Sequence, residues 1–442
     1  MVNLLEQIGS TLATLDPRAY TDADRAALET HLIDTVAASV IGATTPDGAA
    51  ALSFLAHGLS GPLDEIATRV ALTRATEFDD IHLASGTTPG SIVVPTAISV
   101  GGILGLQDAY TFAAAVCAGY EAMTRLGAAI NGQAAGYRGI WATYFCAPFA
   151  AAAVTARLLG LDGERTAHAL AIALTMSAGR AGATPGGRAA RWLLAGEAAR
   201  SGCKAALAAS DGYRGDLALL DGKYLPTAHN IEPALDHFSA DWGSSVLART
   251  SIKPYCSAKQ LLAAVAGFEQ LLARGIDPRD IEIVRVFVPR DFAPMIGHGV
   301  SAGNRLSSIT SAPYQMALAA LHRAGLYDIA RDPFYMNDTI ATLMGKITVH
   351  GYEEFDNHLP GCWPAKVEIV VRGQSETTLV LEAPGDPAQP FTVDAVAQKF
   401  HAAADGMLGA HEVNDWIAAA RSAVGDDDAL EDLQTRYLGF GR

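Results

Sequence analysis

The residues best suited to proton-transfer chemistry lie in one short stretch, Glu77-Phe78-Asp79-Asp80-Ile81-His82. Carboxylates this close together repel one another, so we expect a raised pKa for at least one of them unless Lys or Arg neutralises the group. His82 is then placed to share a proton with Asp79 or Asp80. The structural alternative is an acidic helix N-terminus, with one Asp as the cap and a solvated His82.

The composition and net charge argue against nucleic-acid and membrane partners. The formal net charge is -15, which opposes a nucleic-acid surface because phosphates require a basic face. An anionic small molecule stays possible, since local arginines can outweigh the average charge. The apolar runs are interrupted too often for a membrane span, and the first residues lack the basic start and apolar core of a signal peptide. We therefore expect a cytoplasmic protein with no membrane partner.

The cysteines and glycines give no sign of a metal or nucleotide site. The five cysteines are widely spaced without a CxxC pair, so we interpret them as reduced structural thiols. The chain contains neither GxGxxG nor a P-loop, which argues against a bound nucleotide.

The distribution of elements predicts two domains, as is usual at 442 residues. Residues 3–250 have the pattern of successive helices. Strand-like alternation follows at Ile281–Val288, Lys346–His350 and Ala365–Val371, with a fourth candidate at Thr377–Glu382. A helical pattern returns from Thr392 to Tyr437. We predict a mainly α protein: a large all-helical domain, residues 1–255 and 392–442, with an inserted smaller α+β domain, residues 256–391.

Several segments resemble, in their order and spacing, the MmgE/PrpD family, whose members include 2-methylcitrate dehydratases and cis-aconitate decarboxylases. These segments are Asp34–Gly42, Glu77–Asp80 with His82 and Pro89-Gly90, Ala152–Asp162, Gly196–Gly202, Ile252–Tyr255 and Ser311–Tyr314. The resemblance implies a homodimer in which a helical domain and an α+β lid enclose a cleft, with no metal or organic cofactor.

The chain departs from the family where the family places histidines and lysines in the cleft. Thr88 stands where the family has His before Pro-Gly, and Trp141 replaces another His. The family's Lys-x-x-His becomes Arg191-Trp192-Leu193-Leu194, whereas Lys253 is retained. Dehydration must protonate a hydroxide leaving group, so losing imidazoles weakens that function. Removing and returning an α-proton requires only two proton carriers and cations that hold the enolate charge.

The candidate residues follow from that requirement. Lys253 and Tyr144 are the first choice for the two proton carriers, while His82, with Asp79 and Asp80, would set protonation and orientation. The candidates for substrate binding are Arg138, Arg180, Arg188, Arg191, Tyr314, Thr88, Trp141 and His298. The structural alternatives are a solvated face for the arginines, core packing for Tyr144 and Trp141, and a solvated loop for His298.

We therefore expect a cofactor-independent epimerase of a small polycarboxylate, most similar to the iminodisuccinate epimerase branch of this family. The alternatives are a 2-methylcitrate-type dehydratase, a cis-aconitate-type decarboxylase, or a ligand-binding relative that has lost activity.

Overall fold

The computed structural model describes residues 3–57, 60–179, 190–239, 242, 245–301, 304–329 and 336–441. The fold is mainly α-helical and includes a four-stranded sheet. The chain divides into two compact units. Among the described residues, unit 1 contains the chain up to Ser251 and again from Thr392, and unit 2 contains Ile252–Phe391.

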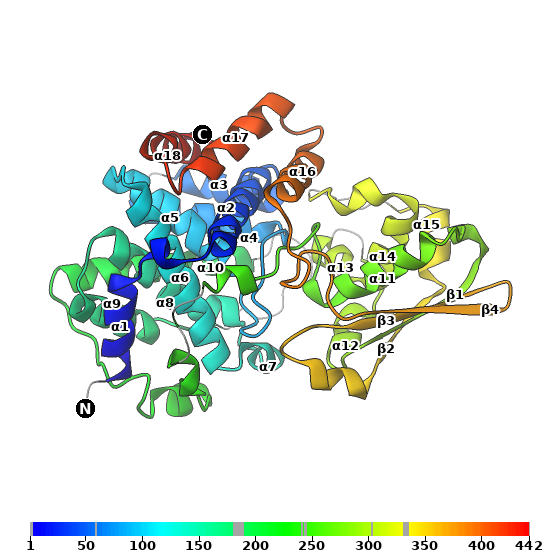
Figure 1. The fold of residues 1–442 in the computed structure, drawn as a ribbon, viewed down its shortest axis with the longest axis horizontal. Coiled ribbons are helices and arrows are strands. Elements are labelled where there is room, and N and C mark those ends of the chain that lie inside the picture. Colours follow the sequence, from blue (N-terminus) through cyan, green and yellow to red (C-terminus); the bar gives the residue numbers. More distant parts are fainter. Residues whose placement is uncertain are drawn as a thin grey trace. The chain divides into compact units, whose positions relative to one another are not determined.

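Unit 1 is built mainly from α-helices (Figure 1). The helices are α1 (Leu4–Thr14), α2 (Asp22–Gly42), α3 (Pro46–Leu55), α4 (Pro62–Ala75), α5 (Gly90–Leu104), α6 (Ala109–Ala129), α7 (Gly132–Tyr137), α8 (Ala142–Leu158), α9 (Gly163–Thr175), α10 (Ala190–Ser210), α16 (Val393–Ala404), α17 (Ala410–Ser422) and α18 (Asp427–Gly439). Between Asp211 and Ser251, the described residues form only the short turns η2 (Leu225–His229), η3 (Leu235–Phe238) and η4 (Leu247–Arg249). The predicted run of helices therefore ends earlier than residue 250, in a stretch that Gly and Pro interrupt.

Small residues let the helices of unit 1 pack closely. Helix α10 packs against α4, α8 and α9. A Cβ at Gly196 would lie 2.2 Å from the carbonyl oxygen of Ala67 in α4, and one at Gly202 would lie 2.1 Å from that of Pro148 in α8. These two glycines therefore permit backbone approaches that no larger residue would allow. As a result, α10 packs directly on the backbones of both α4 and α8.

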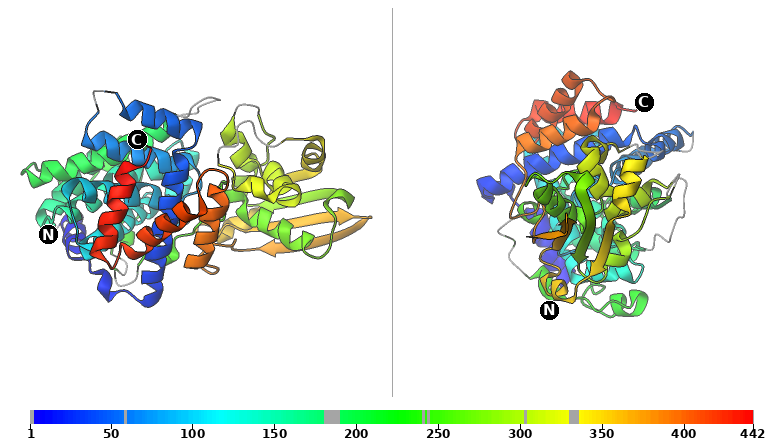
Figure 2. Two further views of the ribbon diagram at one scale, coloured as in Figure 1. Left: turned by 90° about the horizontal axis from the view of Figure 1, so that it is seen from above. Right: turned by 90° about the vertical axis from the view of Figure 1, so that its right-hand side faces the viewer.

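The C-terminal helices belong to unit 1. Helices α16 and α17 pack on α2, and α18 packs on α5; Figure 2 shows these orange and red helices lying across the blue N-terminal ones. A buried ion pair joins α2 to α16, with Lys399 Nζ 2.5 Å from Asp34 Oδ1. Burial raises the pKa of Asp34 to about 6, and the nearby Lys399 opposes that rise.

Unit 2 contains the sheet, in the strand order β2-β1-β3-β4. The strands are β1 (Ile281–Val288), β2 (Ile347–Gly351), β3 (Ala365–Val371) and β4 (Gln374–Val380). Strand β1 pairs in parallel with β2, for example Val284 with Ile347, and antiparallel with β3. The helices are α11 (Leu262–Leu272), α12 (Phe292–Ile296), α13 (Arg305–Thr310), α14 (Ala312–Leu321) and α15 (Asp338–Met344), with short turns η5 (Lys259–Leu261), η6 (Pro278–Asp280), η7 (Arg323–Leu326) and η8 (Glu353–His358). Helix α11 packs on β3 and β4.

All four predicted strands are present, and β1 and β3 have the predicted bounds. Strand β2 lies one residue later than expected, and β4 begins three residues earlier and ends two residues earlier. Arg372 and Gly373 both have positive φ, 52° and 73°, as a two-residue hairpin turn requires. The turn pairs Val371 with Gln374, so the polar residues that follow Gln374 belong to the strand. Their burial pattern is mostly exposed, which is why apolar alternation did not indicate them.

No helix among the described residues is both long enough and apolar enough to cross a membrane.

Candidate active site

Asp80 is fully buried and serves as an acceptor for three groups. Tyr120 donates its hydroxyl to Asp80 Oδ2 over 2.6 Å, and Nδ1 of His31 lies 2.9 Å from the same oxygen. The backbone N–H of Gly90 donates to Asp80 Oδ1 over 2.8 Å. Asp80 therefore ties α2 and α6 to the first residue of α5, and the imidazole that it meets is His31 rather than His82.

The position of residue 90 has no room for a side chain, which explains the glycine of the Pro89-Gly90 pair. A Cβ on Gly90 would lie 2.7 Å from the Thr35 hydroxyl, 2.8 Å from Asp80 Oδ2 and 2.8 Å from the Tyr120 hydroxyl. Only glycine lets the start of α5 approach the carboxylate this closely.

Glu77 and Asp79 share a cation, Arg74, at the end of α4. Arg74 Nη2 lies 3.1 Å from Glu77 Oε1, and Arg74 Nη1 lies 3.1 Å from Asp79 Oδ1. Burial lowers the pKa of Arg74, but Asp79 and Glu77 raise it by more, so the guanidinium remains charged. The expected repulsion among the acids is thus relieved by an arginine three residues before the cluster.

Glu77 also has an unusual backbone, with φ at 54°. A non-glycine residue in the left-handed region costs free energy and persists only where the surroundings enforce it. Here the ion pairs of its carboxylate hold the residue in place.

A second guanidinium, that of Arg191, lies on the other side of Glu77. Arg191 Nη2 is 3.6 Å from Glu77 Oε1, and Arg191 Nε–H donates to the Tyr144 hydroxyl over 3.4 Å. The Arg191 Cζ lies 4.6 Å above the ring of Trp141 and 4.7 Å above that of Trp192. Tyr144 is only 4% exposed. Unit 1 therefore gathers a phenol, two guanidinium groups and two carboxylates, with indole rings around them.

His82 has a different set of partners. Its backbone N–H donates to the Thr87 carbonyl over 2.8 Å, and Nδ1 lies 3.0 Å from the Ser85 hydroxyl. Burial, together with the charge of Arg249, lowers the pKa of His82 to about 4. At neutral pH the imidazole is therefore uncharged and does not serve as a general acid.

The remaining candidates of unit 1 have other hydrogen-bond partners or lie outside the described residues. Thr88 is buried against Thr143, whose hydroxyl accepts the Thr88 backbone N–H over 3.0 Å. Arg138 is exposed and donates to the Asn230 carbonyl over 3.4 Å. Arg180 and Arg188 lie outside the described residues.

Three candidates belong to unit 2. Lys253 is 2% exposed and Tyr314 is fully buried at the start of α14. In His298, Nδ1 lies 2.6 Å from the Gly299 carbonyl oxygen and Nε2 lies 3.1 Å from the Thr310 hydroxyl. Both ring nitrogens of His298 thus have local partners within unit 2.

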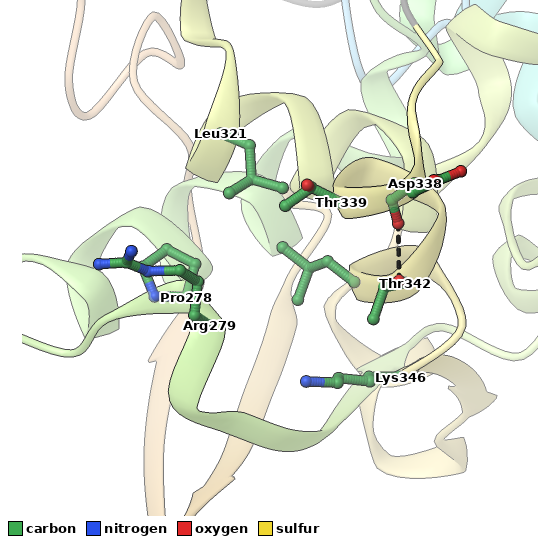
Figure 3. Close-up of a pocket in the computed structure, with 8 residues that line it drawn as sticks. Pro278, Arg279, Leu321, Asp338, Thr339, Thr342 and Lys346 are labelled. Carbon is green, nitrogen blue, oxygen red and sulfur yellow. Dashed lines mark hydrogen bonds between the residues drawn. The ribbon is translucent and has the colours of Figure 1, made fainter.

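Unit 2 also has a pocket of about 280 Å³ that holds none of the predicted residues (Figure 3). Its cations are already engaged: Lys346 Nζ donates to the Ile281 carbonyl over 2.5 Å, and the Arg279 guanidinium binds Asp277. Among the described residues, no group of three or more His, Cys, Asp or Glu side chains has the arrangement of a metal site.

The sequence analysis did not name three residues that contact the acidic cluster: Arg74, His31 and Tyr120. Arg74 had a local signal, because it precedes Glu77 by three residues at a helix end. His31 and Tyr120 had none, since α2 and α6 bring them to Asp80 from 49 and 40 residues away.

Comparisons with known proteins agree with this arrangement of segments. The MmgE/PrpD N-terminal domain matches residues 66–230, and the MmgE/PrpD C-terminal domain matches residues 255–423. The chain belongs to the MmgE/PrpD family. The first domain match contains both the Glu77–Asp80 segment and the Tyr144–Arg191 pair.

Two relatives of the chain carry names that describe an activity. The cis-aconitate decarboxylase of Aspergillus terreus is 31% identical over 212 residues, which are 44% of this chain and 43% of that protein. The cis-aconitate decarboxylase-like protein oryM of Aspergillus oryzae is 33% identical over 172 residues, 37% of this chain and 35% of that protein. The chain thus matches less than half the length of these relatives.

Proposed function

We propose that the protein is an enzyme that forms an enolate from a small polycarboxylate and returns a proton to it. The observation that supports this is the contact between Arg191 and Tyr144 beside Glu77 and Arg74. An N–H donor and neighbouring guanidinium groups stabilise the negative charge on a phenol oxygen that has lost its proton. A guanidinium fork is also suited to a substrate carboxylate. Tyr144 thus fits a proton carrier, and Arg191 a carboxylate binder.

The reaction that we favour is epimerisation of an iminodisuccinate-like compound. A base takes the proton from the carbon next to a carboxylate, the electrons of that C–H bond enter the enolate, and an acid returns a proton to the opposite face. No other bond changes. Thr88 and Trp141 stand at two positions where the family pattern has histidines, and neither side chain supplies the acid that dehydration needs. Lys253 stays our candidate for the second proton carrier.

The second candidate is decarboxylation of a cis-aconitate-like tricarboxylate. It is favoured by the names of the relatives from the two Aspergillus species. The chemistry overlaps, because loss of CO2 leaves its electron pair on the same kind of carbanion, which the enzyme then protonates.

A product assay separates these reactions. The purified protein is incubated in deuterium oxide with iminodisuccinate, 2-methylcitrate or cis-aconitate in separate tubes, and proton NMR follows each one. Epimerisation exchanges an α-hydrogen and produces a diastereomer. New vinylic signals from 2-methylcitrate would support a dehydratase, and a product of cis-aconitate that has lost CO2 would support a decarboxylase. If no tube changes, the proposed function is wrong.

A lysine variant tests the second proton carrier in the same assay. Lys253→Ala should abolish exchange of the α-proton while substrate binding stays measurable, and Lys204→Ala, at an exposed position of α10, is the control. Full turnover by Lys253→Ala would remove Lys253 from the mechanism.

A further inference from the structure

Glu77 is placed where a ligand carboxylate would otherwise meet Arg191. Its Oε1 lies 3.1 Å from Arg74 Nη2 and 3.6 Å from Arg191 Nη2. The first distance is that of a close ion pair, whereas the second is longer than a hydrogen bond. Glu77 is therefore held by Arg74 and makes a weaker contact with Arg191.

Among the described residues, few hydrogen-bond acceptors lie around the guanidinium of Arg191. Trp141 and Trp192 present ring faces, which attract the cation but offer no lone-pair acceptor for its N–H groups. The Tyr144 hydroxyl meets Nε. Because a guanidinium has five N–H donors in a planar fork, a bidentate carboxylate would bind this group better than Glu77 does.

The carboxylate of Glu77 and a ligand carboxylate would compete for the guanidinium of Arg191. Arg74 pairs with both Glu77 and Asp79, and Arg191 contacts Glu77. A ligand carboxylate on Arg191 would bring a further negative charge next to Glu77. At about 4 Å, like charges near a protein surface repel by an amount that changes affinity by tenfold or more.

The backbone of Glu77 is consistent with this arrangement. Its positive φ of 54° is a strained conformation, and such strain is typical of active sites, ligand clamps and switch segments. We propose that Glu77 occupies Arg191 in the absence of ligand as an internal substitute for a substrate carboxylate, and that it sets the affinity and charge selectivity of the site. The polycarboxylate class rests on the proposed function, whereas the competition at Arg191 does not.

The test uses tricarballylate, an unreactive tricarboxylate, and measures its binding by isothermal titration calorimetry at one pH and ionic strength. Glu77→Gln removes the competing charge, and the dissociation constant should fall about tenfold. Glu77→Asp keeps the charge and should stay much closer to wild type. Glu197→Gln breaks a comparable Glu–Arg pair on α10, with Arg200 at 3.0 Å and with Glu197 exposed, and should change nothing.

Unchanged or weaker binding by Glu77→Gln would overturn the inference, as would absence of tricarballylate binding to every variant. Tighter binding by this variant without turnover of any substrate would leave the inference standing and reject the proposed function. Should Glu77→Gln fail to fold, a crystal structure of the wild-type protein with tricarballylate decides: a ligand carboxylate on Arg191, with Glu77 displaced, supports the inference, and an intact Glu77–Arg191 contact contradicts it.

Discussion

The Nε–H of Arg191 donates to the hydroxyl oxygen of Tyr144 over 3.4 Å, and this contact joins the first turn of α10 to the first turn of α8. Both helices lie in unit 1, and the close packing at Gly202 brings them together. The pair therefore depends on the packing of α10 against α8 as well as on its own two side chains.

Removing the Tyr144 hydroxyl tests its role in proton transfer. We expect Tyr144→Phe to lower kcat by about 10²- to 10⁴-fold, the usual effect of losing a general acid or base. KM should change little because the ring remains. Steady-state kinetics on the substrate found by NMR gives both values. Tyr213→Phe, at a tyrosine that is 70% exposed, is the control, and a wild-type kcat in Tyr144→Phe would exclude this role.

Replacing the guanidinium of Arg191 tests carboxylate binding. Lysine keeps the charge but loses the planar fork, so we expect Arg191→Lys to raise KM roughly tenfold and Arg191→Ala to raise it further. Arg200→Lys on the same helix, at a half-exposed arginine, should leave KM unchanged. An unaltered KM in Arg191→Ala would mean that another group binds the substrate.

The sequence was enough to predict the helical and α+β segments, because apolar periodicity and Gly-Pro interruptions are local signals. It placed β1 and β3 at their observed bounds. It missed the start of β4, because the turn at Arg372 precedes polar, exposed residues. Tyr144 and Arg191 were both named from the sequence, yet their contact depends on how closely α8 and α10 pack.

Two partners of the acidic cluster, His31 and Tyr120, could not be predicted from the sequence for the same physical cause, whereas Arg74 had a local signal. The repulsion among Glu77, Asp79 and Asp80 was foreseeable, but the groups that relieve it come from α2, α4 and α6. His82 is adjacent in sequence, and its side chain instead meets Ser85. Proximity along the chain was therefore a poor guide to which imidazole meets which acid.

The buried ion pair between Lys399 and Asp34 should contribute strongly to stability. Lys399→Ala would leave the fully buried Asp34 carboxylate without this cation, and such a loss typically costs about 3–5 kcal/mol. Urea unfolding monitored by circular dichroism measures the free energy of unfolding. Lys204→Ala should cost less than about 0.5 kcal/mol as a surface change. If the two variants were equally stable, the pair would contribute nothing measurable.

His82 should make stability depend on pH. Its pKa is about 4 in the folded protein against 6.5 for an ordinary histidine, so between these values the unfolded chain binds the proton and the folded chain does not. The free energy of unfolding therefore falls as the pH drops from 6.5 to 4, by up to about 1.4 kcal/mol per pH unit.

His82→Gln should remove this component. The unfolding free energy of the wild type minus that of the variant should therefore decrease as the pH falls through that window. The comparison is necessary because Asp34, with its raised pKa of about 6, contributes with the opposite sign and is common to both proteins. A difference that is constant from pH 6.5 to 4 would contradict the lowered pKa of His82.

The central claim is that the protein removes and returns an α-proton of a small polycarboxylate. Proton NMR of one iminodisuccinate diastereomer in deuterium oxide, with wild-type protein and with Tyr144→Phe, tests it most directly. We predict that the wild type replaces the α-proton by deuterium and forms a second diastereomer without release of water or CO2, and that Tyr144→Phe is slower by the factor given above. An unchanged α-proton signal with the wild-type protein would contradict the claim.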